Sequence, residues 1–294
     1  MNQKQPTFKK STQPMMLNVG CGQRFHADWV NVDLMPAEDS VQSCDISQGL
    51  PFEDDQFDAV YHSHVLEHLT PDAGQDLLVE CLRVLKPGGV IRVVVPDLEQ
   101  IANLYLQKHQ QAWDGQGKSS DYQWMKLELL DQLVRSQSGG EMGRFIVEDS
   151  FEDKTFAKQR LGHEFSLCDC QLRSNDDSCT LINRLGGVWV EFKNKMAHRL
   201  VRWLLGREAE VALKEGLFRK QGEIHRWMYD RFSLRDLFKA TGFVDFQVKR
   251  ADESQIDRFV DFQLDSYEGE VRKPDSIFVE ATKAKLAAEI RRAA

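Results

Sequence analysis

The chain reads Leu17-Asn18-Val19-Gly20-Cys21-Gly22 near its start and Val30-Asn31-Val32-Asp33-Leu34 soon afterwards. This pattern predicts a buried strand, a glycine turn, and a second strand that ends in a carboxylate. A glycine turn lets backbone N–H groups approach a ligand that any Cβ would keep away. An ionised acid at the tip of the neighbouring strand can accept two hydrogen bonds from a ribose diol. The two runs therefore indicate a site for a ligand that contains a nucleoside.

Size and composition narrow the class of protein. The 294 residues are 41% hydrophobic, which suits one large domain, or one domain with an insertion. The net charge of −8 without a dominant Lys/Arg stripe argues against a nucleic-acid partner. No apolar run of roughly 18 residues predicts a membrane span. The polar start, Met1–Pro14, predicts a loose tail and no signal peptide, and six scattered cysteines favour a reducing cytoplasm.

Strand-like and helix-like segments alternate up to about Asp97, which predicts an α/β fold with a doubly wound parallel sheet. The expected strands are Met15–Val19, Trp29–Asp33, Ser40–Asp45, Asp58–His62 and Val90–Val95. The expected helix, Pro71–Leu85, ends at the breaker cluster Lys86-Pro87-Gly88-Gly89, which predicts a tight turn. Near the C-terminus we expect helix Phe232–Thr241, strands Phe243–Arg250 and Asp275–Thr282, and a closing helix Ala284–Ala294.

The middle of the chain has a different character. The helical stretches expected there are Leu98–Gln111, Tyr122–Ser136, Phe151–Leu161 and Lys193–Phe218, separated by polar segments that include Ser136–Gly143. We therefore divide the chain into a tail (1–14), a first part of the α/β domain (15–97), a helical insertion serving as lid or oligomerisation surface (98–223), and the remainder of the α/β domain (224–294).

Seven motifs in order resemble those of class I S-adenosylmethionine-dependent methyltransferases, closest to the UbiE-like or Methyltransferase-11 group. Besides the two opening runs they are Leu50-Pro51-Phe52, Phe57-Asp58-Ala59-Val60-Tyr61, Val65-Leu66-Glu67-His68-Leu69, Arg83-Val84-Leu85-Lys86-Pro87-Gly88-Gly89 and Thr241-Gly242-Phe243. The resemblance covers about residues 15–97 and 225–250. It implies S-adenosylmethionine as cofactor and a Rossmann-like, mostly parallel seven-stranded sheet with a long helical insertion after strand 5.

The resemblance also implies residue roles. The glycine loop would contact the methionine part of the cofactor, Asp33 the ribose, and Asp45 with Ile46 the adenine. An alternative for Asp45 is to cap the turn at Ser47-Gln48-Gly49, and Asp58 is expected to be structural. The implied cofactor-binding residues are Asn18, Gly20, Cys21, Gly22, Asp33, Leu34, Asp45, Ile46, His62 and Ser63.

The sequence offers two pairs of candidates for proton transfer. One pair comes directly after the fourth expected strand, and the other lies where the chain re-enters the α/β domain. His62 and Ser63 lie where the resemblance places the reacting sulfonium, and His62 and His64 are the candidates for taking a proton there. In the family, the histidine at His68 fixes the loop after this strand. His225 and Tyr229 are spaced i, i+4 and are expected to share a helix face that lines the acceptor site. A helix cap with an amphipathic interface is the alternative for this second pair.

The link between the glycine loop and the acid is short. Only eight residues separate Gly22 from Asn31, room for one helical turn at best. A dinucleotide would lose the helix N-terminus that binds its pyrophosphate, and there is no Gly-x-Gly-x-x-Gly. S-adenosylmethionine has no phosphate, so the short link favours it over a nicotinamide cofactor.

The acceptor is only broadly indicated. The short spacing and the run Arg272-Lys273-Pro274-Asp275-Ser276 resemble a bacterial subgroup of predicted methyltransferases that accompany polysaccharide biosynthesis. This points to a small molecule, a sugar or a lipid-linked acceptor. The rivals are a cofactor-binding or scaffold protein without activity and a nicotinamide-dependent oxidoreductase.

Two further patterns lie in the insertion. Cys168, Cys170 and Cys179, with the nearby polar-aromatic cluster Gly162-His163-Glu164-Phe165, do not match zinc-ligand spacing, and we expect no metal. An apolar stripe indicates core or a subunit interface, consistent with a homodimer. Flanking lysines and arginines also allow a peripheral membrane contact. The stripe comprises Trp189, Phe192, Met196, Leu200, Trp203 and Leu204.

Overall fold

The computed structural model describes residues 14–36, 38–148, 153–166, 196, 199–220 and 222–285. Cys168, Cys170 and Cys179, and the closing helix expected at 284–294 from residue 286 onwards, lie outside these ranges. The chain forms two compact units. Unit 1 comprises Met1–Pro96, Tyr229–Glu270 and Ser276–Ala294, and unit 2 comprises Asp97–Met228 and Val271–Asp275.

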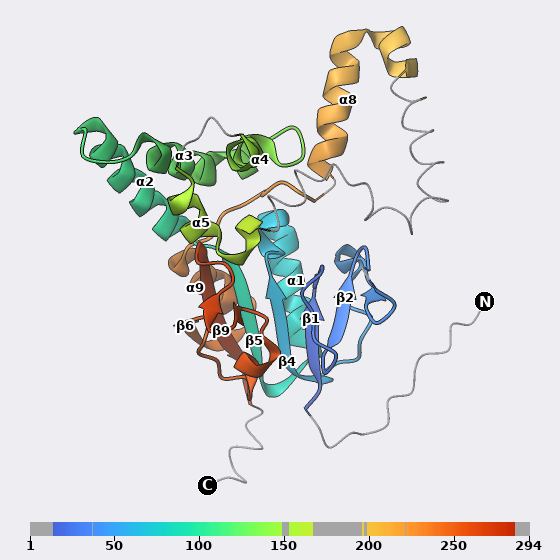
Figure 1. Cartoon of the computed structure of the whole chain (residues 1–294). Coiled ribbons are helices and arrows are strands. Elements are labelled where there is room, and N and C mark those ends of the chain that lie inside the picture. The colour runs from blue at the N-terminus through green and yellow to red at the C-terminus, as the bar shows by residue number, and fades with distance from the viewer. Residues whose placement is uncertain are drawn as a thin grey trace. The chain divides into compact units, whose positions relative to one another are not determined.

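Unit 1 is built on a seven-stranded sheet in the order β3-β2-β1-β4-β5-β9-β6 (Figure 1). Neighbouring strands from β3 to β5 are parallel, and β9 runs antiparallel to both β5 and β6. The predicted Rossmann-like, mostly parallel seven-stranded sheet is therefore confirmed. The strands are β1 (Met16–Val19), β2 (Val30–Asp33), β3 (Gln42–Ser43), β4 (Phe57–Ser63), β5 (Leu85–Pro96), β6 (Phe243–Lys249) and β9 (Ser276–Lys283).

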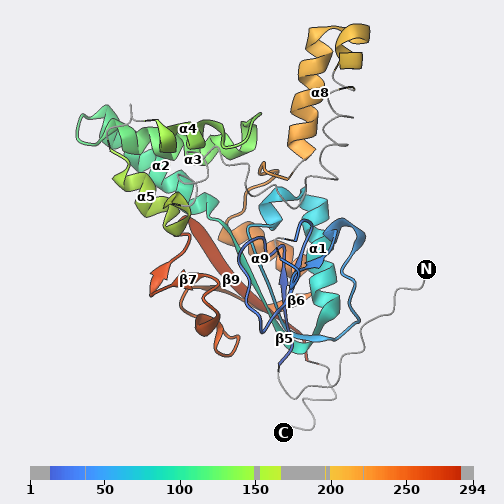
Figure 2. The same ribbon diagram turned by 45° about the vertical axis from the view of Figure 1, so that its right-hand side comes forward.

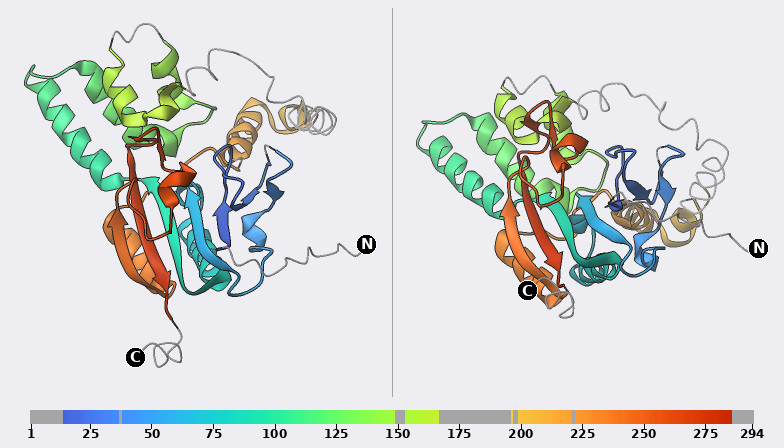
Figure 3. Two further views of the ribbon diagram at one scale, coloured as in Figure 1. Left: turned by 60° about the horizontal axis from the view of Figure 1, so that its bottom comes forward. Right: turned by 90° about the horizontal axis from the view of Figure 1, so that it is seen from below.

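One face of this sheet packs against α1 (Pro71–Val84) and α9 (Arg231–Ala240), which lie on the same side in Figure 3. Thr70 caps the start of α1, and an Asp230–Ser233 capping box starts α9. Apolar side chains at helical spacing on α1 meet alternate strand residues, and burial of this apolar area stabilises the unit. The shared core includes Leu17, Val32, Val60, Leu78, Cys81 and Phe238.

The other face of the sheet is covered by the segment that follows β6. This segment includes the 3-10 helix η4 (Phe259–Phe262), and its aromatic rings pack edge-on against Trp29 and at a tilt against Tyr61. Arg92 of β5 is fully buried here and donates to Asp265 at 2.6 Å and to Glu280 at 2.8 Å. A buried ion cluster thus anchors the covering segment to β5 and β9.

The breaker cluster Lys86-Pro87-Gly88-Gly89 lies within β5, where we expected a tight turn before the strand. β5 pairs with β4 at Leu85 and again from Val90, so four residues bulge opposite Asp58. Gly88 has φ +81°, a conformation that suits glycine. The chain does turn at these residues, as expected. Because β5 pairs with β4 on both sides of the turn, the turn is a bulge within one strand and does not precede the strand.

The short link between β1 and β2 contains no helix, as its length predicts. It is held instead by two buried amides. Asn18 Nδ2 donates to Arg24 O at 2.9 Å and to Asn31 Oδ1 at 3.1 Å. Asn31 Nδ2 in turn donates to His26 O and Trp29 O at 2.9 and 2.8 Å.

Unit 2 is helical, with α2 (Leu98–Trp113) and α3 (Ser119–Val134) side by side (Figure 2). Its other helices are α4 (Gly140–Val147), α5 (Thr155–Leu161) and α8 (Arg207–Lys220). Helices α2, α3, α4 and α5 share a hydrophobic core that includes Ile101, Trp124, Met125, Phe145 and Leu161. No helix in the described part of the chain is long and apolar enough to cross a membrane.

Helix α4 corrects the expectation of an irregular segment at 136–143. Gly139 and Gly140 have φ +75° and +55°, which makes them turn residues. The cap for the helix comes from α3, because Asp131 Oδ1 accepts from Glu141 N at 2.7 Å. A capping acid ten residues upstream leaves no local signature.

Candidate functional site

Gly20 and Gly22 form a turn at the carboxyl end of β1, the strand edge at which open α/β sheets bind ligands. Their φ angles are +63° and +52°. The amides of Gly20 and Cys21 donate to Val32 O, which ties the turn to β2. A Cβ on Gly22 would meet nothing within 4 Å, whereas one on Gly20 would approach Val65 Cγ2 to 2.5 Å. The loop is therefore packed against Val65 at Gly20 and has open space beside Gly22.

Asp33, the predicted ribose acid, lies beside this loop at the end of β2. Its Oδ2 accepts from Gly22 N at 2.8 Å and its Oδ1 from Met35 N at 2.9 Å. Each carboxylate oxygen has two lone pairs, so both can still accept from a ribose diol. The following Leu34 and Met35 are 64% and 73% exposed, and provide apolar surface next to the acid.

Asp45 adopts the capping role that we held as the alternative. Its Oδ1 accepts from Ser47 N at 3.0 Å and from Ser47 Oγ at 2.7 Å, at the start of the 3-10 helix η1 (Ile46–Gln48). The carboxylate is exposed, and its Oδ2 has no hydrogen bond from the residues described. A cap and an adenine contact can coexist on this side chain.

Two other predicted cofactor contacts are limited by burial. The Asn18 amide is committed to the β1–β2 link and is buried, so its side chain is withdrawn from the loop surface, contrary to our expectation of a contact there. Burial, with the nearby Asp33 charge, raises the pKa of the Cys21 thiol to about 12. Cys21 is therefore a neutral thiol and no nucleophile.

His62 and Ser63 end β4. His62 is fully buried, and burial lowers its pKa to about 4 although Glu67 opposes the shift. Neither ring nitrogen has a hydrogen-bond partner within the described ranges. A ring that is neutral at pH 7 and holds a proton so weakly is a poor general base. The buried hydroxyl of Tyr61 donates to Asp265 Oδ1 at 2.6 Å, and Ser63 partly opposes the rise that burial causes in the pKa of this hydroxyl.

His64 is held by partners on both ring nitrogens. Nδ1 lies 2.8 Å from Glu67 Oε1, and Nε2 lies 3.1 Å from Ser276 Oγ. Glu67 belongs to the 3-10 helix η2 (Leu66–His68), and Ser276 opens β9. The sequence predicted His64 as a candidate for proton transfer, and it noted Ser276 only as the end of a late run, without a link to His64 212 residues away.

The predicted shared helix face of His225 and Tyr229 is wrong, because residues 222–230 form no helix. His225 belongs to unit 2, where its N–H donates to Gln132 O at 2.9 Å. Tyr229 belongs to unit 1 and is buried near Glu67. Burial and the Glu67 charge raise its pKa to about 12, so Tyr229 can donate a proton in a hydrogen bond but cannot act as a base at neutral pH.

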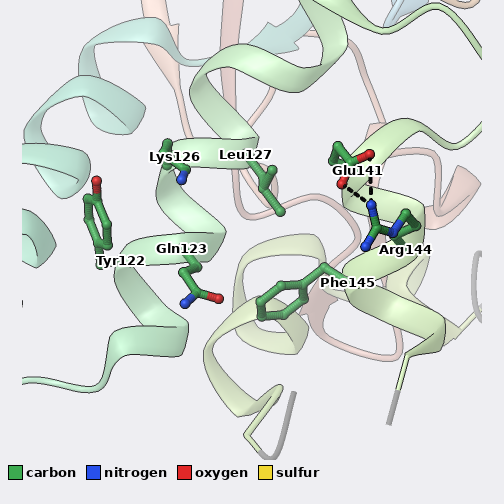
Figure 4. A pocket seen from close by; sticks show the side chains of 7 residues that line it. All are labelled: Tyr122, Gln123, Lys126, Leu127, Glu141, Arg144 and Phe145. Atoms are coloured by element: carbon green, nitrogen blue, oxygen red, sulfur yellow. Dashed lines mark hydrogen bonds and ion pairs between the residues drawn. The ribbon is translucent and has the colours of Figure 1, made fainter. Parts of the chain in front are cut away.

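Unit 2 contains a hollow of its own, of about 260 Å³ (Figure 4). It lies between α3 and α4, and none of the predicted site residues line it. One wall carries an exposed ion pair in which Arg144 bonds Glu141 at 2.9 Å. The lining residues are Tyr122, Gln123, Lys126, Leu127, Glu141, Arg144 and Phe145.

Two runs noted in the sequence, the one that begins at Gly162 and the one that begins at Arg272, contact each other in unit 2. Gly162 has φ +57° and packs under the 271–274 backbone, where a Cβ would come within 2.6 Å of Arg272 O. The next N–H, that of His163, donates to the same oxygen at 3.1 Å. The contact explains the glycine at position 162.

Residues 17–93 match the model of a family described as a methyltransferase domain. The match spans the strands from β1 into β5 and includes the glycine loop, Asp33 and the end of β4. No curated protein matches the chain.

Solved structures similar to this chain include three S-adenosylmethionine-dependent methyltransferases. One, from Thermotoga maritima and described as a possible histamine N-methyltransferase, is 14% identical, with 93% of this chain and 84% of that chain covered and a TM-score of 0.36. One from Archaeoglobus fulgidus is 13% identical, with 92% and 87% covered and a TM-score of 0.37. One from Methanosarcina mazei is 13% identical, with 94% and 95% covered and a TM-score of 0.38.

Residues 17–93 are therefore similar to a methyltransferase domain, and the cofactor that such a domain implies is S-adenosylmethionine. The site fits this ligand, since the open side of Gly22, the carboxylate of Asp33 and the exposed Leu34 share one strand edge. No helix N-terminus follows the glycine loop, and this cofactor needs none because it carries no phosphate.

Proposed function

We propose that this methyltransferase acts on a small-molecule, sugar or lipid-linked acceptor by in-line transfer. The acceptor nucleophile attacks the sulfonium methyl, and the S–C bond pair returns to sulfur. The positive sulfur already makes the methyl electrophilic, so the protein mainly has to position the two reactants. The observation that carries the proposal is the glycine turn with Asp33 beside it at the ends of β1 and β2. We propose cofactor contacts from Gly20, Gly22, Asp33, Leu34, Asp45 and Ile46.

Calorimetric titration with S-adenosylhomocysteine tests the cofactor site. Asp33→Asn is expected to weaken binding at least about tenfold, because it removes the charge from a hydrogen bond worth about 1.5–3 kcal/mol. Asp58→Asn is the matched control. Asp58 lies at the other end of the sheet, where it bonds Met15 N at 2.8 Å and Lys86 at 2.6 Å, and the variant should bind as tightly as the native protein. Equal affinities for Asp33→Asn and the native protein would refute the ribose role.

A lipid-linked acceptor is favoured by the exposed surface of residue 196 and residues 199–220. Within 199–220, six basic side chains outnumber three acidic ones, although the whole chain has a net charge of −8. Such a surface suits the anionic face of a membrane, with Trp203 entering the headgroup layer. The exposed apolar side chains are Met196, Leu200, Trp203, Leu204, Leu205, Val211 and Leu217.

Co-sedimentation with phosphatidylglycerol vesicles tests this surface, with phosphatidylcholine vesicles alongside. The native protein is expected to sediment only with the anionic vesicles, and Trp203→Ser to remain in the supernatant. Phe232→Ser, at an exposed ring of α9, is the control that should still bind. A panel of nucleotide sugars, oligosaccharides and polyprenyl-linked sugars with tritiated S-adenosylmethionine then identifies the acceptor.

The acceptor-covering role of residues 98–223 and a homodimer remain predictions. A scaffold protein that binds cofactor without transferring methyl is the alternative. If the tritium remains on S-adenosylmethionine with every class of compound in the panel, the result would favour this alternative.

A further inference from the structure

Three side chains of unit 1 form a chain of contacts at the carboxyl end of β4. Glu67 Oε1 lies 2.8 Å from His64 Nδ1, and Ser276 Oγ lies 3.1 Å from His64 Nε2. The Glu67 side chain is fully buried, and the His64 side chain is 15% exposed. A carboxylate, an imidazole and a hydroxyl in this order form the arrangement in which a carboxylate orients a general base.

The backbone places this imidazole under constraint. His64 has φ +55°, a left-handed conformation that is uncommon for a residue with a side chain. Its N–H donates to Val94 O at 2.9 Å, which fixes the residue against the end of β5. Strained residues that the surroundings hold in place concentrate at functional sites.

Glu67 determines which nitrogen can accept a proton. An ionised carboxylate only accepts hydrogen bonds, so the proton of a neutral His64 lies on Nδ1 and the lone pair on Nε2. The hydroxyl of Ser276 then donates to Nε2. The position of this hydroxyl shows that an O–H group can be presented to the lone pair. His64 also lies close enough to Asp265 to lower the pKa of that carboxyl, and Asp265 is itself bonded to Arg92 at 2.6 Å.

We propose that His64 is the general base of methyl transfer, with Glu67 and Ser276 as its positioning residues. The proposal rests on the proposed function. The acceptor X–H displaces the Ser276 hydroxyl from Nε2, and X then forms a bond to the sulfonium methyl while the S–C bond breaks. The X–H proton goes to Nε2, which leaves an imidazolium paired with Glu67 and releases neutral S-adenosylhomocysteine. His62, which is buried and has no partner among the described residues, takes no part in this step.

Nitrogen-15 NMR of histidine-labelled protein with S-adenosylhomocysteine tests the tautomer without any acceptor. The signals of His64 are identified by their absence from the spectrum of His64→Gly. At pH 7.5 we expect these signals to show a proton on Nδ1 and a lone pair on Nε2. Glycine suits φ +55°, so this variant should fold. A proton on Nε2, or protons on both nitrogens, would overturn the proposal, because neither form can accept the acceptor's proton.

Kinetics with the acceptor that the panel identifies tests the base itself. His64→Gly is expected to lower kcat at least about 100-fold with unchanged cofactor affinity, and added imidazole should restore part of it. Glu67→Gln should lower kcat about tenfold at constant KM, since the amide keeps the contact but not the charge. Asp58→Asn, whose carboxylate pairs with Lys86 at the opposite end of the sheet, is the control and should stay within about threefold of native. No rescue by imidazole would refute the proposal, whereas a panel without any acceptor would refute only the proposed function.

Discussion

At the residue scale, Gly20 and Gly22 share a left-handed backbone but differ in their surroundings. Gly20 is enclosed by the side chain of Val65, and Gly22 borders open space. The left-handed conformation costs a residue with a Cβ about 1–2 kcal/mol. The two glycines therefore allow backbone strain and steric overlap to be separated.

Gly20→Ala is expected to lower the free energy of unfolding by about 3 kcal/mol, because strain and overlap add, and Gly22→Ala by about 1 kcal/mol, from strain alone. Urea unfolding measures both. In a double-mutant cycle, Val65→Ala should recover part of the loss at Gly20 and none at Gly22. Equal losses for the two alanine variants would contradict the close packing of Gly20.

His62 makes stability depend on pH. Burial lowers its pKa from 6.5 to about 4, so between these values the unfolded chain binds a proton that the folded protein excludes. Its contribution is complete above pH 6.5 and is lost as the pH falls toward 4. Between pH 7 and pH 5 this amounts to roughly 2 kcal/mol.

His62→Leu removes the titrating ring while keeping an apolar side chain in the core. Urea unfolding at pH 7 and pH 5 should show a smaller loss of stability for the variant than for the native protein, by roughly 2 kcal/mol. Identical losses would show that His62 does not titrate differently in the folded state.

At the element scale, the second face of the sheet depends on one buried arginine. Arg92 donates to Asp265 and Glu280, and its guanidinium lies 4.6 Å over the ring of Phe259. Burial raises the pKa of Asp265, and the charge of Arg92 opposes that shift. Without the guanidinium, two carboxylates would remain buried without a counter-charge.

Arg92→Met should therefore cost about 3–5 kcal/mol in urea unfolding. The control is Arg250→Met, which breaks an exposed pair with Asp252 and should leave the urea midpoint close to that of the native protein. Neutralising both acids, by Asp265→Asn and Glu280→Gln in the Arg92→Met background, should recover stability. A loss no larger than that of the control would rule out the anchoring role.

At the scale of the whole molecule, each unit has a separate hydrophobic core, and the cofactor residues belong to unit 1. A ligand that binds only the folded state stabilises it by mass action. S-adenosylhomocysteine at 100 times its dissociation constant should add about 2.7 kcal/mol to the unfolding free energy of unit 1. NAD should add none, since no helix follows the glycine loop. Calorimetric scans measure both, and stabilisation by NAD alone would contradict the cofactor assignment.

Local patterns alone predicted most of the strands, α1, α9 and the glycine turn at the end of β1, because turn residues and apolar periodicity act over a few positions. The helix expected through His225 and Tyr229 failed, since a four-residue spacing does not by itself produce a helix. Helix α4 and the β5 bulge were missed because their causes, the Asp131 cap and the pairing with β4, lie elsewhere in the chain.

The sequence by itself indicated a methyltransferase domain and its cofactor, since both follow from short motifs that occur in a fixed order along residues 17–93. Tertiary structure decided which candidate groups are usable. It buried His62 without a partner, raised the pKa of Tyr229, and brought Ser276 to His64 across 212 residues. Burial and long-range contacts set the protonation of a side chain, and neither is encoded by its neighbours in sequence.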